Sequence, residues 1–472
     1  GRRGDLGECA LERERPGVVA LEPLARGANL AALQEIGDEL LHPRSVPRLT
    51  VGRKVAKLAE HMEYQHLIYD WNTVTVSFDW TTARYDLNDE TLRDGLQCPS
   101  VKDPPMEAKL RLLHLMADLG IVAADIGLPG AGPRVRDQVR ALAKEIVSAK
   151  LPIAPNCAAR TVVADVQPIV DISQETGIAI EAATFIGSSP IRQYVEDWTL
   201  DRMLKVSEEA VTFAVKHDLP VMFVTEDTTR AHPETLKELY SNAIRWGAKR
   251  ICLADTAGHA TPDGVVNLVQ YIRDEVVRPS GEDIKLDWHG HRDRGMGVAN
   301  TLAAIEAGAD RVHATALGIG ERVGNTEMDL LIVNLYLHGS YRGDLKKLPE
   351  YCRLVSEAVG RPIGVDYPVM GEDAFRTGTG VHAAAIMKAR QKGDEWLADR
   401  VYSSVPAGAL GVKQKIEISP VSGLSNVKYW LEAHGYDAAN EQYTKVLFDA
   451  AKQSDHVLTD LECHALIASV GA

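Results

Sequence analysis

The chain has 472 residues, of which 45% are hydrophobic and 25% are charged, a balance typical of a folded globular protein and not of a disordered, collagen-like or disulfide-rich chain. Its 52 basic and 66 acidic residues give a formal net charge of -14 at pH 7. Because this average charge repels phosphate and anionic lipid, it argues against a nucleic-acid or membrane-surface binder and requires a local positive site for any anionic substrate.

Residues 1–80 are predicted to form an N-terminal extension of mixed helix and strand. Apolar spacing indicates helices around residues 30–41 and 53–66, and a β-prone run lies between Trp71 and Trp80. We expect this extension to be a dimer arm or a cover over the closed end of the next domain. The start of the chain lacks the apolar core of a secretory signal, and no window approaches about 18 uninterrupted apolar residues. Six dispersed cysteines fit a reducing compartment, so we expect a cytoplasmic protein.

From residue 81 to residue 340 the sequence alternates short apolar runs with longer amphipathic segments. Eight runs have the pattern of strands: 83–87, 121–126, 152–155, 178–183, 220–224, 250–254, 284–288 and 311–316. Apolar residues recur at helical spacing in the segments 106–119, 134–148, 199–216, 233–246, 262–273 and 297–307. Eight β–α repeats over about 250 residues predict a catalytic (β/α)8 TIM barrel of parallel strands, and not an open doubly wound sheet.

The region after the barrel is predicted to be mainly helical. We divide it into a helical linker subdomain at residues 341–395 and a helical C-terminal subdomain at residues 396–472. Short loops are expected at Gly360-Arg-Pro and Gly378-Thr-Gly, because glycine and proline interrupt helices.

Polar residues cluster directly after the predicted strands. The clusters are residues 89–95, 226–227, 255–256, 289–291 and 318–325. In a TIM barrel the loops that follow the strands carry the active site at one rim of the barrel. The sequence therefore predicts one site that gathers residues from these separate segments.

His289 and His291 are spaced to bind one metal ion. Alternate residues of a strand point to the same face, so two imidazoles at i and i+2 reach a common ion if that face looks into the barrel mouth. Asp94 and Asn325 follow the first and eighth strands, which lie close to the seventh in a closed barrel. Two nitrogen and two oxygen ligands suit a catalytic divalent ion, Mg2+, Mn2+ or Zn2+. The alternative is a structural or surface role for the two histidines.

Arg93 precedes the predicted carboxylate ligand Asp94. A guanidinium beside a metal-bound keto acid can donate to the carbonyl or carboxylate oxygen and stabilise developing negative charge. The alternative is an ion pair of Arg93 with Asp94 or Glu226. Gln97, further along the same loop, is expected to supply a supporting hydrogen bond.

Three motifs together resemble the signature of the α-isopropylmalate synthase and homocitrate synthase family of metal-dependent TIM barrels. They are Asp89-Glu-Thr-Leu-Arg-Asp-Gly-Leu-Gln97, then His289-Gly-His291 with Asp293 and residues 297–300, then Gly318-Ile-Gly-Glu-Arg-Val-Gly-Asn-Thr326. The resemblance implies an acyltransferase of amino-acid biosynthesis that joins acetyl-CoA to a 2-oxo acid by a Claisen condensation and releases CoA. The alternatives are homocitrate synthase-like use of a dianionic 2-oxo acid, a hydroxyacyl-CoA lyase with the reverse chemistry, and a catalytically silent barrel.

The resemblance assigns roles around the metal. The family's metal ligands are matched by Asp94, His289, His291 and Asn325, and its catalytic arginine is matched by Arg93. The glycine-rich loop that contains Gly318 and Gly320 is expected to turn backbone N–H groups towards the CoA end of the substrate.

The resemblance also assigns groups that handle the two substrates. Glu226 matches a rim glutamate that helps to organise the acyl-CoA and the base, and Thr256 matches a threonine that contacts the 2-oxo acid carboxylate. His382 resembles a histidine that reaches into the barrel of the partner chain to assist proton abstraction, although its neighbouring residues differ from the family's pattern. This role implies a homodimer with exchanged C-terminal segments.

The predicted substrate pocket departs from the family's pattern. Ala183 and Val224 stand where isopropylmalate synthases commonly carry a histidine and a serine, so we expect a wider, more apolar pocket that favours a bulkier alkyl or aryl 2-oxo acid. Arg192 lies near the position of an arginine that binds a distal carboxylate in homocitrate synthases, which would favour a dianionic 2-oxo acid instead. The structural alternative is an ion pair of Arg192 with Glu196 or Asp197.

Regulation by leucine is not expected. Leucine-inhibited members of the family carry a further regulatory domain after the helical subdomains. This sequence ends at Ala472, soon after a predicted helix at residues 460–470. We therefore expect no leucine regulatory domain and no leucine feedback.

Overall fold

The computed structural model describes residues 67–74 and 78–470. The helices expected around residues 30–41 and 53–66 lie outside these described residues. The described residues from Tyr69 onward form one compact unit.

The β-prone run between Trp71 and Trp80 has turns at both of its ends. Short 3-10 turns form at Trp71–Thr73 and at Trp80–Thr82. Each turn follows an aspartate whose carboxylate accepts a hydrogen bond from the backbone N–H two residues later. The aspartate thus satisfies a backbone N–H group within each turn, which stabilises the turn over an extended strand at these residues.

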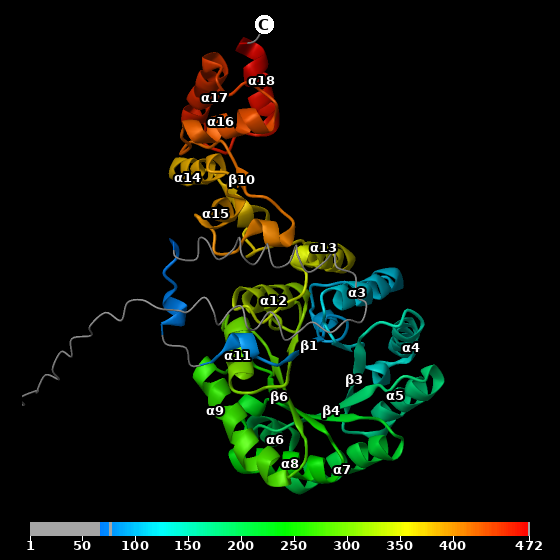
Figure 1. The fold of residues 1–472 in the computed structure, drawn as a ribbon. Helices are drawn as coiled ribbons and strands as arrows, with labels where there is room; N and C mark the ends of the chain where they lie inside the picture. The colour runs from blue at the N-terminus through cyan, green and yellow to red at the C-terminus, as the bar shows by residue number, and fades with distance from the viewer. Residues whose placement is uncertain (1–66, 75–77, 471–472) are drawn as a thin grey trace, which may run out of the picture. The chain divides into compact units, whose positions relative to one another are not determined.

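Eight parallel strands close into a barrel in the order of the sequence (Figure 1). They are β1 (Asp86–Asp89), β2 (Ala123–Asp125), β3 (Ala154–Arg160), β4 (Glu181–Gly187), β5 (Val221–Glu226), β6 (Arg250–Asp255), β7 (Lys285–Gly290) and β8 (Arg311–Ala314). The barrel closes where Asp86 to Asp89 of β1 pair in register with Arg311 to Ala314 of β8. The predicted TIM barrel is confirmed.

Helices cover the outside of the barrel between successive strands (Figure 1). They are α3 (Met106–Asp118), α4 (Pro133–Ser148), α5 (Val163–Thr176), α6 (Pro190–Glu196), α7 (Leu200–Lys216), α8 (Pro233–Arg245), α9 (Pro262–Ile272), α10 (Arg278–Ser280), α11 (Gly297–Glu306) and α12 (Met328–Leu337). The outer faces of the strands and the inner faces of the helices form one buried apolar cluster that includes Leu113, Ile169 and Phe223. The main core therefore lies outside the strands, and the inside of the barrel carries different side chains.

Several strands extend beyond the apolar runs of the sequence because residues that face the inside of the barrel are polar. The run 152–155, for example, corresponds to a strand at Ala154–Arg160, which continues through the polar residue Asn156. Asn88 of β1 and Asn156 of β3 are fully buried and share a hydrogen bond of 2.6 Å. The end of an apolar run is therefore not the end of its strand in this barrel.

Four charged side chains form the floor of the barrel interior, near the N-terminal ends of the strands. Arg250 donates to Glu181 at 3.1 Å and to Asp287 at 2.6 Å. Arg311 donates to the same two carboxylates at 2.5 and 2.6 Å. Two guanidinium groups thus balance two carboxylates, as buried charges require.

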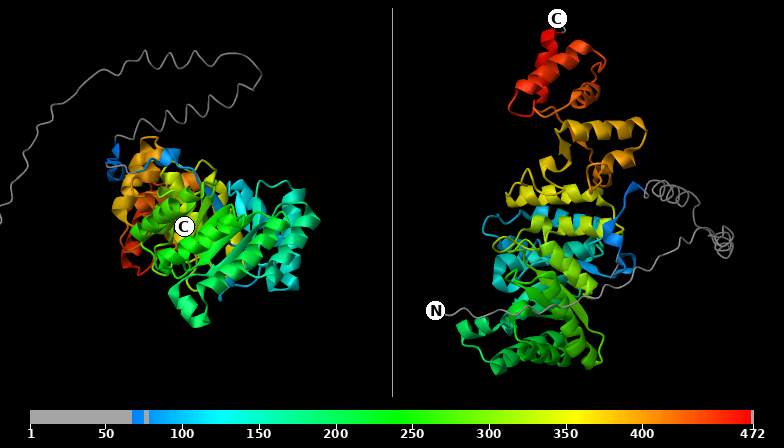
Figure 2. Two further views of the ribbon diagram at one scale, coloured as in Figure 1. Left: turned by 90° about the horizontal axis from the view of Figure 1, so that it is seen from below. Right: turned by 90° about the vertical axis from the view of Figure 1, so that its left-hand side faces the viewer.

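The chain continues after the barrel through α13 (Leu348–Val359) into a mainly helical region, as predicted. Its helices, coloured yellow to red in Figure 2, are α14 (Gly380–Gln391), α15 (Glu395–Arg400), α16 (Leu424–Ala433), α17 (Glu441–Gln453) and α18 (Asp460–Val470). Two short strands that the helical prediction does not include, β9 (Arg376–Thr377) and β10 (Lys415–Ile416), pair in parallel. One small apolar cluster joins α14, α15 and β10, and another joins α16, α17 and α18. The proposed boundary between residues 395 and 396 stays a prediction.

Candidate active site

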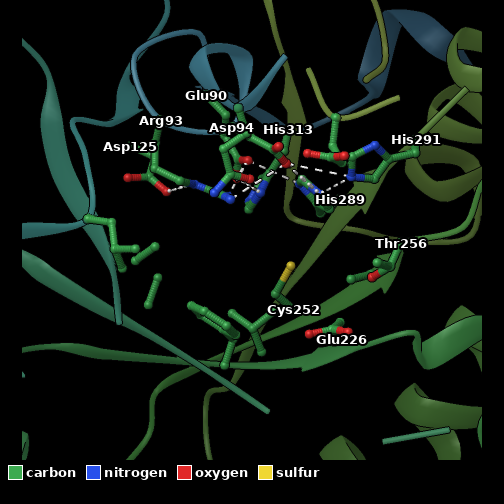
Figure 3. Close-up of a pocket in the computed structure, with 18 of the residues that line it drawn as sticks. Glu90, Arg93, Asp94, Asp125, Glu226, Cys252, Thr256, His289, His291 and His313 are labelled. Carbon is green, nitrogen blue, oxygen red and sulfur yellow. Dashed lines mark hydrogen bonds and ion pairs between the residues drawn. The ribbon is translucent and has the colours of Figure 1, made fainter. Parts of the chain in front are cut away.

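A cavity of about 220 Å3 opens among the C-terminal ends of the barrel strands (Figure 3). One wall is polar and comes from β1, β2, β7, β8 and the loops after them, with the side chains of Glu90, Arg93, Asp94, Asp125, His289, His291 and His313. The facing wall is apolar and comes from β3 to β6, with the side chains of Ala158, Ala183, Phe185, Met222, Val224 and Cys252. The cavity therefore lies at the rim where the sequence predicts the site, and its two halves differ in chemistry.

Three of the four predicted metal ligands converge on one point of the polar wall. Oδ2 of Asp94 lies 3.3 Å from Nε2 of His289 and 3.6 Å from Nε2 of His291. The two imidazole nitrogens are 3.3 Å apart. Ligand atoms bound about 2.1 Å from one ion are about 3.0 to 3.4 Å from each other in octahedral or tetrahedral geometry. The spacing of these three atoms therefore fits a single divalent ion.

Buried oxygens without hydrogen-bond partners support this fit. Oδ1 of Asp94 and Oδ1 of Asn325 are both buried, and neither has a partner among the described residues. Asn325 pairs with His291 along the backbone, and its Nδ2 donates to the carbonyl of Ile319 at 3.3 Å, so its oxygen is left as an available ligand. A buried oxygen without a partner is costly, and coordination of a cation would satisfy it.

Charges within the site set the protonation of the ligands. Burial opposes the charged form of His289, but the carboxylates of Glu90 and Asp94 outweigh it and raise the pKa of His289 to about 10. Burial and the charge of His289 lower the pKa of His291 to about 4. Burial also raises the pKa of Asp94, but Arg93 and the histidines outweigh it and hold that pKa below its usual range. Near neutral pH Asp94 is therefore ionised and His291 is neutral, which are the forms that bind a cation, whereas His289 is protonated and must release a proton to bind one.

Arg93 is held by carboxylates on either side. Its Nη2 lies 2.6 Å from Glu90 and its Nε lies 2.8 Å from Asp125 at the end of β2. Of the two ion pairs considered for Arg93, the pair with Asp94 forms, with 3.5 Å between Nη1 and Oδ2. Glu226 is not a partner of Arg93 among the described residues, because it lies on β5 while β1 and β2 supply nearer carboxylates.

Three further predicted residues, Gln97, Thr256 and Glu226, line the cavity. The hydroxyl oxygen of Thr256 accepts a hydrogen bond of 2.9 Å from the backbone N–H of Asp227, which leaves the hydroxyl proton available to an acceptor in the cavity. Burial raises the pKa of Glu226, although the charge of Arg192 opposes this shift.

Arg192 forms an ion pair with Glu196, which was the structural alternative to binding a distal carboxylate of the substrate. Its Nη1 lies 3.0 Å from Glu196, and its Nε lies 3.3 Å from Glu226. Arg192 lines a neighbouring cavity that shares Phe185 and Glu226 with the main cavity, and it does not line the main cavity itself. Two carboxylates therefore already engage this guanidinium.

Ala183 and Val224 both face the cavity, as the prediction of an apolar pocket requires. Together with Met222 and Cys252 they form a small apolar cluster that is separate from the main core. The sulfur and methyl groups of this cluster present no charge to a ligand.

Gly318 and Gly320 are buried and do not line the cavity. At Gly320, where φ is +157°, an added Cβ would lie 2.3 Å from Nδ2 of Asn325. At Gly318, where φ is +60°, an added Cβ would lie 2.8 Å from the side chain of Glu327. The close approach to Asn325 and Glu327 explains why both positions are glycine, and the contact with CoA stays a prediction.

His382 does not line the cavity of its own chain. It lies near the start of α14, where its ring stacks on Tyr402 with 3.8 Å between the ring centroids. The part that the sequence assigns to His382 in proton abstraction stays a prediction.

Three buried members of the polar wall, Glu90, Asp125 and His313, are not among the site residues that the sequence predicts. Each is a titratable residue in or directly after a strand, on the face that alternation turns inward. Burial raises the pKa of Asp125 to about 6, against the opposing charge of Arg93. For Asp125 and His313 the available signal was a titratable residue inside an otherwise apolar run, but nothing in the sequence shows which residues they face.

Comparison with known proteins places this site in a family. The model of the HMGL-like family matches residues 84–355, which span the whole barrel. The chain belongs to the HMGL-like family. Homocitrate synthase AksA from Methanopyrus kandleri is 34% identical over 362 residues, which cover 76% of this chain and 85% of that protein. A 2-isopropylmalate synthase from Nitratidesulfovibrio vulgaris is 30% identical over 382 residues, covering 79% and 70%. The predicted relationship to these synthases and the predicted acyltransferase class are confirmed.

A solved structure shares the fold of this HMGL-like chain. The HMG-CoA lyase from Brucella melitensis matches with a TM-score of 0.50 and 18% sequence identity, over 59% of this chain and 100% of that chain. This likeness concerns the barrel alone. In the described part of the chain no helix combines the length and apolar character needed to cross a bilayer. The cytoplasmic location and the homodimer stay predictions.

Proposed function

We propose that the chain catalyses the metal-dependent condensation of acetyl-CoA with a 2-oxo acid to give a 2-substituted malate and free CoA. The observation that carries the proposal is the convergence of Asp94, His289 and His291 beside Arg93 at the mouth of the barrel. The names of the relatives, homocitrate synthase and 2-isopropylmalate synthase, support the same reaction class.

A divalent ion, Mg2+, Mn2+ or Zn2+, would be held by Asp94, His289 and His291, with Oδ1 of Asn325 as a further ligand. When bound, it would supply a Lewis acid that polarises the carbonyl of the 2-oxo acid. The neighbouring guanidinium of Arg93 donates to the oxygen on which negative charge develops. Because carboxylates on two strands hold Arg93, little reorganisation is needed as that charge appears.

Thr256 and Gln97 orient the carboxylate of the 2-oxo acid. Thr256 donates its hydroxyl proton to this carboxylate, since its oxygen already accepts from Asp227. Gln97 supplies a further hydrogen bond from the loop after β1. The loop that contains Gly318 and Gly320 is proposed to lie at the CoA end, although the backbone N–H of Gly318 already donates to the carbonyl of Thr315 at 3.0 Å.

Carbon–carbon bond formation requires a base for the acetyl methyl group. Glu226 lies at the rim, and burial raises the pKa of its carboxylate, which makes it a stronger base. His382 of the partner subunit assists, because this residue does not line the cavity of its own chain and would reach it through an exchanged C-terminal segment of a homodimer. The methyl proton passes to the base, and the methyl carbon bonds to the keto carbon while the electron pair of the keto double bond moves to its oxygen, which takes up a proton to become a hydroxyl. Water then hydrolyses the thioester to release CoA.

A thiol-release assay tests this proposal. With acetyl-CoA and a panel of 2-oxo acids, we expect CoA release that depends on both substrates and on added Mg2+, Mn2+ or Zn2+. A chelator should abolish the release, and excess metal should restore it. Cleavage of a hydroxyacyl-CoA without condensation would indicate a lyase instead, and no turnover with any of these substrates would indicate a silent barrel.

We propose further that the 2-oxo acid carries an apolar side chain. Ala183, Met222, Val224 and Cys252 form an uncharged wall that faces the metal ligands across the cavity. The competing substrate, a dianionic 2-oxo acid, would need a positive group in this half of the cavity. Arg192 lies outside it and is already paired with two glutamates.

The variant Ala183→Leu tests the apolar pocket. The added carbons enter the cavity opposite the metal ligands, so we expect kcat/KM for a branched or aryl 2-oxo acid to fall at least about tenfold, while kcat/KM for pyruvate changes less than about threefold. Ala149→Leu at the exposed end of α4 is the matched control and should change neither value. An equal loss for pyruvate and for the bulky acid would contradict the pocket assignment.

A further inference from the structure

A row of buried side chains leads away from His289 into the barrel. Nδ1 of His289 lies 3.2 Å from Oε2 of Glu90, and Oε1 of Glu90 lies 2.6 Å from Nδ1 of His313. Nε2 of His313 in turn lies 2.9 Å from Asp287. Glu90 and His313 are 2% exposed and Asp287 is fully buried, so water does not compete for these contacts.

The row ends in the charged floor of the barrel. Asp287 accepts hydrogen bonds from Arg250 and Arg311, both at 2.6 Å. Asp287 and His289 alternate on β7, and Arg311 and His313 alternate on β8, so each strand turns both of its residues inward. Closure of the barrel between β8 and β1 then brings Glu90 between the two histidines (Figure 3).

We propose that Glu90 and His313 are positioning residues for the metal ligand His289. The carboxylate of Glu90 accepts a hydrogen bond from Nδ1 of His289, which directs the Nε2 lone pair to the point shared with Asp94 and His291. A carboxylate behind a metal-binding histidine fixes the tautomer and the ring orientation and makes the ligand more basic. This inference rests on the metal site of the proposed function.

Glu90 also contacts both the metal ligand His289 and the catalytic arginine Arg93. The Oε2 atom that faces His289 lies 2.6 Å from Nη2 of Arg93. The other oxygen, Oε1, lies 2.6 Å from Nδ1 of His313, so both oxygens of Glu90 face a nitrogen of a neighbouring side chain. One carboxylate thus sets the orientation of both a ligand and the guanidinium beside it.

A second metal ion between Glu90, His289 and His313 is the competing interpretation, since these residues also bring three ligand atoms close together. The guanidinium of Arg93 lies against the same carboxylate and would repel a cation there. We therefore infer one metal ion for each chain.

Metal binding by the metal-free protein, without substrates, tests this inference. Isothermal titration with Mn2+ or Zn2+ should give one ion per chain, and Glu90→Gln should weaken the affinity by about 10- to 100-fold. His313→Gln should weaken it less, by about three- to tenfold, because Glu90 would still contact the ligand. With Co2+ bound, the visible absorption spectrum of Glu90→Gln should shift, since the ligand ring is no longer fixed.

Asp89→Asn is the matched control. Asp89 is a fully buried carboxylate directly before Glu90, but it accepts hydrogen bonds from the N–H of Thr91 at 2.7 Å and from the hydroxyl of Tyr351, and touches no ligand. Its variant should lower the melting temperature and leave the metal affinity within about twofold. If Glu90→Gln does not fold, the metal affinity is measured with His313→Gln and Glu90→Asp instead.

Three results would overturn the inference: unchanged affinity in folded Glu90 and His313 variants, an equal loss of affinity in Asp89→Asn, or two ions per chain. The proposed function fails in a different way, because the unaltered protein would then bind no divalent ion or would bind it without turnover. The two failures are therefore distinguishable.

Discussion

Asp94→Ala should remove both metal binding and turnover. The Oδ2 atom of Asp94 lies 3.3 and 3.6 Å from the two imidazole nitrogens, so its loss removes the carboxylate from the proposed ligand set. A catalytic metal lowers a barrier by several kcal/mol, and at about 1.4 kcal/mol for each factor of ten we expect kcat/KM to fall by about 1,000-fold or more. Metal content after dialysis and CoA release measure the two effects.

The control for this variant is Asp118→Ala, which removes an exposed carboxylate at the end of α3. It should leave metal content and kcat/KM within about twofold, because exposed charges contribute little. If Asp94→Ala instead retained its metal and most of its activity, the proposed metal centre would be wrong, and with it the reaction that depends on it.

Arg93→Lys should lower kcat by about 100- to 1,000-fold while the metal affinity changes little. Lysine keeps the positive charge but loses the planar fork with which Arg93 contacts Glu90 and Asp125 at 2.6 and 2.8 Å. A donor that stabilises charge developing in the transition state affects kcat more than KM, and removal of one such donor costs this factor in other enzymes. Steady-state kinetics with both substrates varied separate the two parameters.

Arg111→Lys serves as the matched control, because Arg111 forms an exposed ion pair with Glu350 on the outside of the barrel. Its kinetics should be unchanged within about twofold. A large rise in KM for the 2-oxo acid at constant kcat in Arg93→Lys would assign Arg93 to substrate binding alone. Loss of metal from this variant would show that Arg93 acts by holding Asp94.

The sequence predicts the order of the barrel elements because the alternation of strands and helices is local. It places strand ends poorly, because the inside of this barrel is polar. The run 83–87, for example, corresponds to a strand at Asp86–Asp89, whose last two residues are a buried aspartate and a buried asparagine. The helix α5 gives a weak local signal, since Pro168 lies inside it and proline usually ends a helix.

The metal ligands could be predicted because their signal is short-range. His289 and His291 are two residues apart on one strand, and the loops with Asp94 and Asn325 carry recognisable motifs. Glu90 and His313 could not be paired with His289 in this way, because they are distant in sequence and meet only through closure of the barrel. The contacts that orient a site are thus harder to predict than its ligands.

The two unlike walls of the cavity have a consequence for engineering. Ala158, Ala183 and Met222 stand on strands that contribute none of the metal ligands, so changes at these positions alter the shape that a substrate must match while the metal ligands stay in place. A combinatorial library confined to these three positions should therefore yield catalysts with new selectivity at a higher rate than random mutagenesis of the barrel.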